Sequence, residues 1–346
     1  MGRGASSPAA LWAGNVIRGD SYGASNNSTI LTAQQSAVLV GVVPPLEVPA
    51  KRWKRAFVAH RRAMPFLYAL EKRSRKPPDS SLSLMCVWWK ALSANDPSSP
   101  VFDNSLMYDM LPRGTRILVG PKLRRFYPRL HHATVEIRTA FLDQTVRTIV
   151  QQQQQQESSD TGKDLSVRLI SLGAGYDVRS IKFREQGVVH EAHELDLPEV
   201  IDAKQAILQR LQRRRPTITP DKWPEFHPVD LNDVSKVKDI LKEILTNDDP
   251  SSRTFTIFLF EAVLIYLNED VPRTLLRICG DVLRDSTVGS EGDNSGALVF
   301  ADRLERIPGG DADIGNRELA NLGWKVVSWQ PKPGLARHMG YAVPLQ

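Results

Sequence analysis

One stretch of the chain, residues 167–200, restricts its fold more than any other (VRLISLGAGYDVRSIKFREQGVVHEAHELDLPEV). It begins with a short apolar run rich in β-branched residues, which is typical of a buried parallel strand. Gly173 and Gly175 interrupt this run, and two glycines there allow a sharp turn and a close approach of the backbone to a ligand. A helix over 178–186 and a second strand at 188–190 are expected to follow. This order predicts half of an α/β fold that binds a nucleoside.

Acidic residues follow the glycine turn at the distance expected for ribose contacts. Glu194 and Asp196 come after the predicted second strand, and a carboxylate about 20 residues beyond such a turn can accept hydrogen bonds from ribose hydroxyls. Both would share one face of a strand, so both are candidates. Glu261 abruptly ends a further apolar run, and its carboxylate is expected at the end of a third strand. Ligands of open parallel sheets bind outside the carboxyl ends of strands, so these acids should lie near the glycine turn.

The rest of the chain predicts a helical N-terminal half followed by alternating helices and strands. Helices are expected over 51–76, 82–92, 102–111, 135–150, 201–215, 234–245, 271–283 and 315–322, and strands over the first half of 255–267, 297–301, 324–329 and 341–345. The last two strands are expected to pair as an antiparallel hairpin. The proline-rich segment 216–228 is expected to be a loop. The predicted organisation is a disordered tail (1–50), a helical region (51–150), a low-complexity loop that begins with six glutamines (151–164) and a core (165–346).

Composition narrows the classes of protein that the chain can belong to. No apolar run approaches the roughly 18–20 residues of a membrane-spanning helix, so no span is expected. Cys86 and Cys279 are far apart and lack CxxC spacing, and the seven histidines show no HExxH pattern, so neither a disulfide framework nor a metal site is predicted. A reducing, cytoplasmic location and a monomeric state are expected.

The N-terminal region has a composition of its own. The first 70 residues contain only two acids, Asp20 and Glu47, and are rich in Ser, Ala and Arg. A disordered basic tail is the first interpretation, and an organelle transit peptide is the alternative. The first six residues, MGRGAS, also fit the short N-myristoylation pattern, which arises often by chance.

The glycine turn itself favours one class of nucleoside over another. A dinucleotide-binding turn needs a third glycine and a helix N-terminus that is open to pyrophosphate. Here Val178 stands at the third-glycine position, and Asp177 lies where a pyrophosphate would approach. A carboxylate there repels an anion and suits a ligand with a positive group, such as S-adenosylmethionine. Methyl transfer is therefore favoured over hydride transfer by an NAD-dependent oxidoreductase.

Four motifs together resemble one family. GAGYDVR, HELDLPEV, VDL and FEAVLIYL are similar, in order and spacing, to motifs of the leucine carboxyl methyltransferase family, over roughly residues 103–346. The family pattern has threonine where this chain has Val178. The resemblance implies a Rossmann-like class I methyltransferase fold: an α/β protein with a mainly parallel sheet, a C-terminal antiparallel hairpin and an N-terminal helical extension. It also implies S-adenosylmethionine as the cofactor.

The resemblance implies cofactor-binding roles on both sides of the glycine turn. Arg138, in the segment VEIRTAFLDQ, matches the arginine that binds the carboxylate of the cofactor, which a guanidinium can do in a bidentate way. Gly173 and Gly175 would let the methionine part lie against the backbone. Asp196 matches the acid that binds the ribose.

Four more residues gain roles from the resemblance. Asp230 and Leu231 match the pair that lines the adenine, and Glu261 matches the acid near the amino end of the methionine part. Tyr266 matches the tyrosine that faces the reacting centre and is the candidate catalytic residue.

Several of these residues also have purely structural interpretations. Arg138 can form an ion pair with Asp143 or Glu136 on a helix surface. Asp230 can cap the helix that follows it. Tyr266 can be a core aromatic residue with a satisfied hydroxyl group.

The chemistry that the resemblance implies is methyl transfer to a carboxylate, of a protein C-terminal leucine or of a small acid. A carboxylate is already ionised at neutral pH, so no Ser-His-Asp triad or metal is needed. Nucleic acid is not an expected partner, and an anionic protein tail is. The basic residues that could attract such a tail are Lys122, Arg124, Arg125 and Arg129. The alternatives are a small-molecule O-methyltransferase of the same fold and a nucleoside-binding module without turnover.

Overall fold

The computed structural model describes most of the chain between residues 81 and 345. The described residues are 81–94, 105–111, 116, 129–157, 165–246, 253–287, 295–304, 307, 311–330 and 338–345. The predictions for the tail 1–50, the helix 51–76 and the basic stretch 122–128 lie outside these residues. The chain divides into two compact units, residues 1–141 and 142–346.

The described part of the first unit is helical. Its helix α4 (Ser81–Ala94) contacts α5 (Ser105–Met110), and the long helix α7 (Arg129–Glu157) begins in this unit and ends in the second. Most residues of α4 are apolar, and Trp88 is fully buried. The helix predicted over 82–92 is therefore confirmed, and the helix predicted over 102–111 is confirmed for Ser105–Met110.

The helix α7 corrects the prediction of a loop that begins at residue 151. It continues through the glutamine run 151–156 and ends at Glu157. Glutamine has a high helix propensity, and a run that follows an established helix extends it at low cost because the nucleus already exists. Neither α7 nor any other helix in the described part of the chain is long and apolar enough to cross a membrane.

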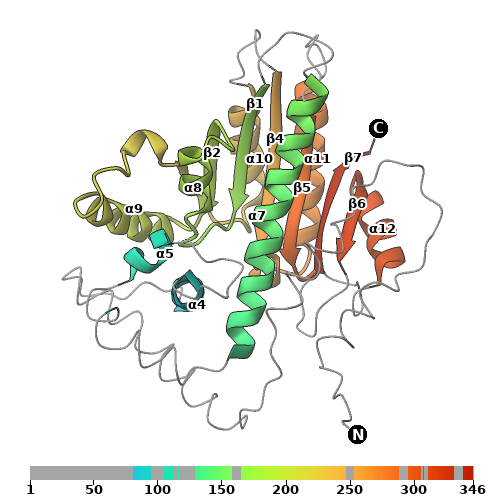
Figure 1. The fold of residues 1–346 in the computed structure, drawn as a ribbon. Coiled ribbons are helices and arrows are strands. Elements are labelled where there is room, and N and C mark those ends of the chain that lie inside the picture. The colour runs from blue at the N-terminus through green and yellow to red at the C-terminus, as the bar shows by residue number, and fades with distance from the viewer. Residues whose placement is uncertain are drawn as a thin grey trace, which may run out of the picture. The chain divides into compact units, whose positions relative to one another are not determined.

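The second unit is built on one sheet of seven strands (Figure 1). The strand order is β3-β2-β1-β4-β5-β7-β6, and every neighbouring pair is parallel except those that involve β7. The strands are β1 (Leu165–Leu172), β2 (Glu191–Asp196), β3 (Glu225–Pro228), β4 (Arg253–Glu261), β5 (Ser295–Asp302), β6 (Trp324–Gln330) and β7 (His338–Pro344). This topology confirms the Rossmann-like α/β fold with its C-terminal antiparallel hairpin.

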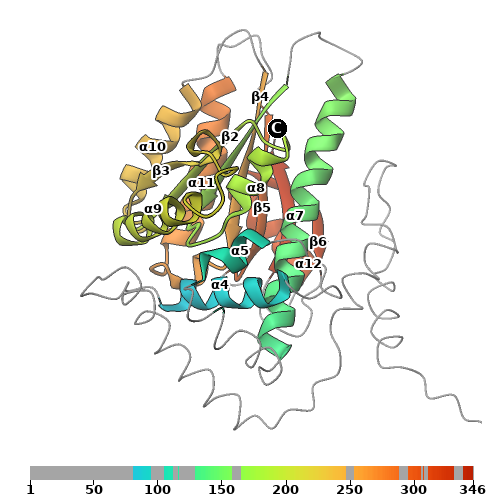
Figure 2. The ribbon, with the colours of Figure 1, turned by 60° about the vertical axis from the view of Figure 1, so that its left-hand side comes forward.

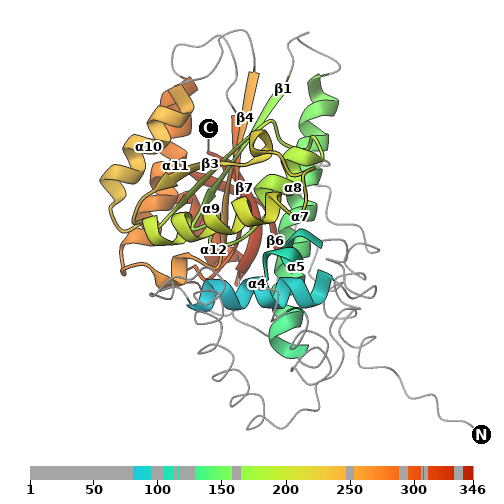
Figure 3. The ribbon, with the colours of Figure 1, turned by 90° about the vertical axis from the view of Figure 1, so that its left-hand side faces the viewer.

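Helices cover both faces of the sheet. Figures 2 and 3 show α10 (Val234–Thr246) beside α11 (Val271–Thr287), and side chains of both pack with those of the central strands in one hydrophobic cluster. α8 (Arg179–Glu185) lies on the other face. The remaining helices of this unit are α9 (Pro198–Gln212), α12 (Ala312–Ala320) and the short η2 (Pro220–Lys222) and η3 (Leu264–Tyr266). Because both faces are covered, β1 and β4 are apolar along most of their lengths rather than alternating.

The predictions for the segments that form β2 and β3 were wrong. The second strand begins at Glu191 rather than at Val188, so Glu194 and Asp196 lie within β2 rather than after it. The segment 216–228, predicted as a loop, contains the edge strand β3. β3 has only four residues and ends in Pro228, which an edge strand tolerates because one side of it makes no ladder hydrogen bonds.

Candidate active site

β1 ends in a turn with two glycines in the left-handed region of backbone conformation. The φ angles of Gly173 and Gly175 are +70° and +54°. A Cβ atom at Gly173 would lie 2.2 Å from Cγ2 of Val263, which follows β4. The Gly173 N–H donates a hydrogen bond of 2.8 Å to the carbonyl oxygen of Leu195 in β2. The turn therefore packs closely against the ends of both neighbouring strands.

Asp196 stands at the carboxyl end of β2, directly beside this turn. Its Oδ2 accepts a hydrogen bond of 2.6 Å from the Gly175 N–H, and its Oδ1 accepts one of 2.8 Å from the Leu197 N–H. Burial raises the pKa of the carboxyl group, and the two backbone donors offset this rise only in part. The side chain is thus held in one orientation at the end of β2.

Glu194, the other candidate for the ribose, is held elsewhere. Its carboxylate forms an ion pair with Lys204 of α9, and both side chains are almost completely buried. Burial raises the pKa of Glu194, against the opposing effect of Lys204. Because this carboxylate is already compensated inside the protein, Asp196 is the better placed of the two acids.

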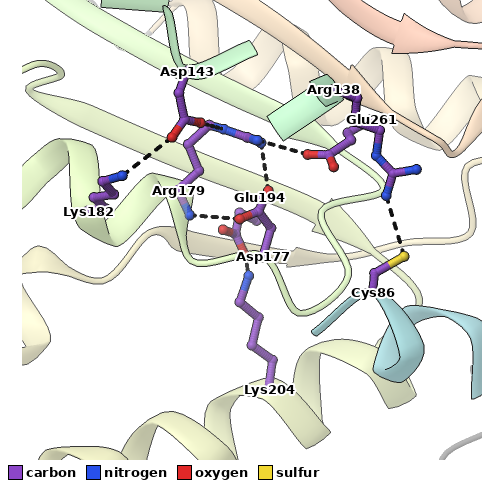
Figure 4. Close-up of polar contacts among 9 residues, drawn as sticks. All are labelled: Cys86, Arg138, Asp143, Asp177, Arg179, Lys182, Glu194, Lys204 and Glu261. Carbon is purple, nitrogen blue, oxygen red and sulfur yellow. Dashed lines mark hydrogen bonds and ion pairs between the residues drawn. The ribbon is translucent and has the colours of Figure 1, made fainter. Parts of the chain in front are cut away.

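A single guanidinium joins three carboxylates next to the glycine turn (Figure 4). Arg179, at the start of α8, contacts Asp177 and Asp143 at 2.6 Å each and Glu261 at 2.9 Å. These acids come from the turn, from α7 and from the end of β4. The Arg179 side chain is only 3% exposed, so the ion pairs are largely shielded from water. This group of four residues is called the Arg179 cluster below.

The Arg179 cluster contains three carboxylates and one guanidinium. Burial alone would lower the pKa of Arg179, but Asp177, Glu261 and Asp143 outweigh it and raise the pKa, so the guanidinium stays charged. Lys182 adds a second cation 3.4 Å from Asp143. Asp177 is bound by Arg179, so it is the group of three carboxylates, rather than Asp177 alone, that would disfavour an anion such as pyrophosphate.

The segment after β4 is fixed by a buried acid from the neighbouring strand. Asp302, at the end of β5, is fully buried and accepts hydrogen bonds from the N–H groups of Val263 (2.6 Å) and Leu264 (2.9 Å). Ala262 has a φ of +57°, which is uncommon for a residue with a side chain. Tyr266 follows in η3 and is 56% exposed, so the alternative that it is a core aromatic residue is wrong.

Asp230 and Leu231 follow β3 and differ in their surroundings. Asp230 is exposed, and its Oδ1 accepts hydrogen bonds of 2.9 Å from the backbone and side-chain nitrogens of Asn232. Leu231 is buried in the hydrophobic cluster. The side chain of Asp233 rather than of Asp230 accepts from an N–H of the first turn of α10, that of Lys236 at 3.2 Å. The helix-cap interpretation of Asp230 is therefore wrong.

Arg138 lies in the first unit, on the part of α7 that precedes the boundary between the units. Its side chain is buried, and Nη2 lies 3.4 Å from Sγ of Cys86 in α4 (Figure 4). Asp143, one of the two acids suggested as its surface partner, binds Arg179 and Lys182 instead. The surface ion pair with Asp143 is therefore excluded for Arg138.

The sequence interpretation did not select Arg179 as a site residue. The arginine belongs to the motif GAGYDVR, and its position two residues after Asp177 was the available signal. Its other partners are 36 and 82 residues away in the chain, so no local pattern could indicate them.

Comparison with known proteins gives a match to one family. A family model described as leucine carboxyl methyltransferase matches residues 83–279. Among solved structures, the chain is similar to magnesium protoporphyrin IX methyltransferase from Synechocystis PCC 6803 with bound S-adenosylmethionine, with 14% identity over 67% of this chain and 93% of that one and a TM-score of 0.37. An O-methyltransferase family protein from Burkholderia thailandensis is 14% identical over 72% of this chain and 71% of that one, with a TM-score of 0.31. No curated protein matches the chain.

The family match covers more than half of the 346 residues. It includes nearly all of α4, which precedes the segment 103–346 that carries the sequence motifs, and it ends within α11. It also contains the glycine turn, Asp196 and the whole Arg179 cluster. The chain therefore belongs to the leucine carboxyl methyltransferase family and is an S-adenosylmethionine-dependent methyltransferase.

Proposed function

We propose that this methyltransferase acts on a carboxylate, that of the C-terminal leucine of an acceptor protein. The observation that carries the proposal is the family match over residues 83–279. The three carboxylates of the Arg179 cluster support the cofactor side of it. S-Adenosylmethionine carries a sulfonium and an ammonium group, and carboxylates beside the glycine turn suit such cations better than they suit a pyrophosphate.

We assign the nucleoside part of the cofactor to the ends of β2 and β3. Asp196 is proposed to bind the ribose, because its carboxylate is held beside the glycine turn and is not consumed by an ion pair as that of Glu194 is. Asp230 and Leu231, which follow β3, are proposed to line the adenine. The apolar side chain of Leu231 supplies a flat contact, and the exposed Asp230 supplies hydrogen-bond acceptors.

We assign the methionine part to the glycine turn and the end of β4. The methionine part is proposed to lie against the backbone of Gly173 and Gly175, at Gly173 on the side that Val263 does not fill, and Glu261 brings negative charge near the proposed ammonium position. Tyr266, an exposed residue just beyond β4, is proposed to face the reacting centre. Arg138 is proposed for the carboxylate of the cofactor on the family resemblance alone, since a guanidinium binds a carboxylate in a bidentate way.

The proposed reaction needs positioning more than proton transfer. When bound, S-adenosylmethionine supplies a methyl group made electrophilic by a positively charged sulfur. An acceptor carboxylate is ionised at neutral pH and can form the new C–O bond without a general base. Tyr266 would orient the acceptor, and exclusion of water when the substrates bind would favour a step that neutralises opposite charges.

The chemical nature of the acceptor can be tested with paired peptides. The enzyme and methyl-labelled S-adenosylmethionine should label a peptide that ends in a free leucine carboxylate and should leave the same peptide with a C-terminal amide unlabelled. The label should be released by mild base, as expected for an ester. Equal labelling of both peptides would contradict carboxylate methylation. Labelling only of small molecules in a cell extract would instead support a small-molecule O-methyltransferase.

Asp196→Asn is expected to weaken cofactor binding by about 1–3 kcal/mol, the usual loss for a hydrogen bond to a charged group. Burial raises the pKa of Asp196, so the affinity of the wild-type protein should begin to fall at a higher pH than for an ordinary aspartate as the medium is acidified. Titration calorimetry at several pH values measures both effects. The affinity of the variant should not fall in this way at low pH, because an amide does not titrate.

The control for this experiment is Asp239→Asn, which changes an exposed acid on α10. It should bind the cofactor like the wild-type protein at every pH. Normal affinity of Asp196→Asn, or an equal pH dependence in both variants, would remove Asp196 from the site.

A further inference from the structure

A second group of chemically active side chains lies on the opposite face of β2. Because side chains alternate along a strand, His193 and Leu195 point to one face of β2, and Glu194 and Asp196 to the other. β2 and β3 are paired so that His193 is opposite Glu225 and Leu195 is opposite His227. This register brings His193, Glu225 and His227 together, and they are called the His–Glu cluster below.

The donor atoms of the His–Glu cluster are close enough to share one ion. Nδ1 of His193 and Nε2 of His227 share a hydrogen bond of 3.1 Å, which a bound ion would replace, and Nδ1 of His193 lies 3.6 Å from Oε2 of Glu225. The distance between His227 Nε2 and Glu225 Oε1 is 4.0 Å. Two imidazole nitrogens that bind one zinc ion tetrahedrally, at about 2.0–2.1 Å each, lie about 3.3 Å apart. The observed nitrogen–nitrogen distance is therefore close to the one that a shared zinc ion requires.

The second ring nitrogen of His193, Nε2, provides an independent observation that bears on whether the cluster can bind an ion. The residue is 8% exposed, and within the described structure its buried Nε2 makes no hydrogen bond. Oε2 of Glu191 lies 3.8 Å from this nitrogen, beyond hydrogen-bond distance, and Arg168 holds that same oxygen at 2.7 Å. Metal-binding histidines typically donate the second ring N–H to a carboxylate, and Glu191 is a carboxylate within a short movement of this nitrogen.

We propose that His193, His227 and Glu225 bind a divalent transition-metal ion, with zinc the best match. Two imidazoles and one carboxylate suit zinc better than magnesium or calcium, which prefer oxygen ligands alone. The Glu225 side chain is 69% exposed, so water can complete the coordination. Further negative charge comes from Glu191 and from Glu243 of α10. The ion would fasten the edge strand β3 to β2.

Zinc binding by the full-length protein tests this site directly. Untagged protein is stripped with a chelator and titrated with zinc in competition with a chromophoric indicator, without S-adenosylmethionine. One equivalent should bind to the wild-type protein. His227→Asn and Glu225→Gln should each weaken binding by at least roughly 10–100-fold, the loss that changes in outer-shell partners already cause. Because the readout is metal binding, it is independent of the proposed methyl acceptor.

A matched histidine variant serves as the control. His190→Asn removes an exposed imidazole outside the cluster, and the asparagine oxygen can still accept the hydrogen bond that His190 Nδ1 receives from the Val167 N–H. It should bind zinc like the wild-type protein. Glu225 is exposed, so loss of binding in its variant cannot reflect a collapsed core. No binding by the wild-type protein, or equal binding by His227→Asn, would overturn the proposal.

Cobalt provides a second readout of the same site. Four-coordinate cobalt(II) absorbs visible light much more strongly than six-coordinate cobalt(II), so the wild-type protein should turn intensely coloured with one equivalent. The colour should disappear in His227→Asn and persist in His190→Asn. A spectrum that is the same in all variants would place the bound ion away from the His–Glu cluster.

Discussion

Replacing Arg179 by methionine is expected to lower the free energy of unfolding by about 3–5 kcal/mol, the cost of removing one partner from a buried ion pair. Methionine keeps the apolar length of the side chain and removes only the charge. Asp143, Asp177 and Glu261 would then remain close together without the guanidinium that separates them. Urea unfolding followed by circular dichroism measures the loss.

Two further measurements distinguish the loss of the Arg179 ion pairs from a general loss of stability. Lys182→Met removes a partly exposed cation from the same Asp143 and should cost no more than about 1 kcal/mol, as for other exposed pairs. At low pH the free energies of unfolding of Arg179→Met and of the wild-type protein should become more alike, because protonated carboxyl groups no longer repel one another. A loss for Arg179→Met as small as that for Lys182→Met would show that the cluster does not hold the turn, α7 and β4 together.

Gly173→Ala is expected to cost about 2–5 kcal/mol of stability, the sum of left-handed backbone strain and overpacking. The φ of +70° gives the first contribution, and the approach of the new Cβ to Val263 at 2.2 Å gives the second. The turn would have to move away from the end of β4, so cofactor affinity should fall as well. Thermal unfolding and calorimetry with S-adenosylmethionine measure the two losses.

Gly187 offers a matched control for this glycine. Its φ of +66° is nearly the same, but a Cβ there would meet no atom within 4 Å. Gly187→Ala should therefore cost only the backbone strain of about 1–2 kcal/mol and leave cofactor binding intact. Val263→Ala in the Gly173→Ala background should recover only part of the loss, since it removes Cγ2 at 2.2 Å and leaves Cβ at 2.7 Å. Equal losses for the two alanine variants would show that the contact with Val263 is unimportant.

Sequence patterns predicted the elements whose signal is local. The apolar runs before Gly173 and Glu261 correspond to β1 and β4, and the two C-terminal runs correspond to the hairpin β6–β7. In these segments burial on both faces, or a clear turn, fixes the structure regardless of distant partners. The family motifs in turn located the acids at the strand ends, since they lie within the same short segments.

The elements that were missed depend on partners far away in the chain. β2 consists largely of polar residues, and its acids Glu191 and Glu194 are paired by Arg168 and Lys204, so no apolar run marks this strand in the sequence. In the Arg179 cluster and the His–Glu cluster, the residues in contact are likewise separated by 32 to 82 positions, apart from one close pair in each. Such sites become visible only when strand register and helix packing are known.

The helical glutamine run has a consequence for how the chain tolerates changes in length. Val150, just before the run, is buried, whereas most of the glutamines are exposed. Each glutamine gained or lost changes the length of the helix by about 1.5 Å and rotates its C-terminal end by about 100°. These changes affect only the part of the helix beyond the last buried turn. Asp143 and Arg147, whose side chains contact Arg179 and the Phe183 ring, precede the run and keep their register. A change in the number of glutamines should therefore leave the contacts of Asp143 and Arg147 unchanged.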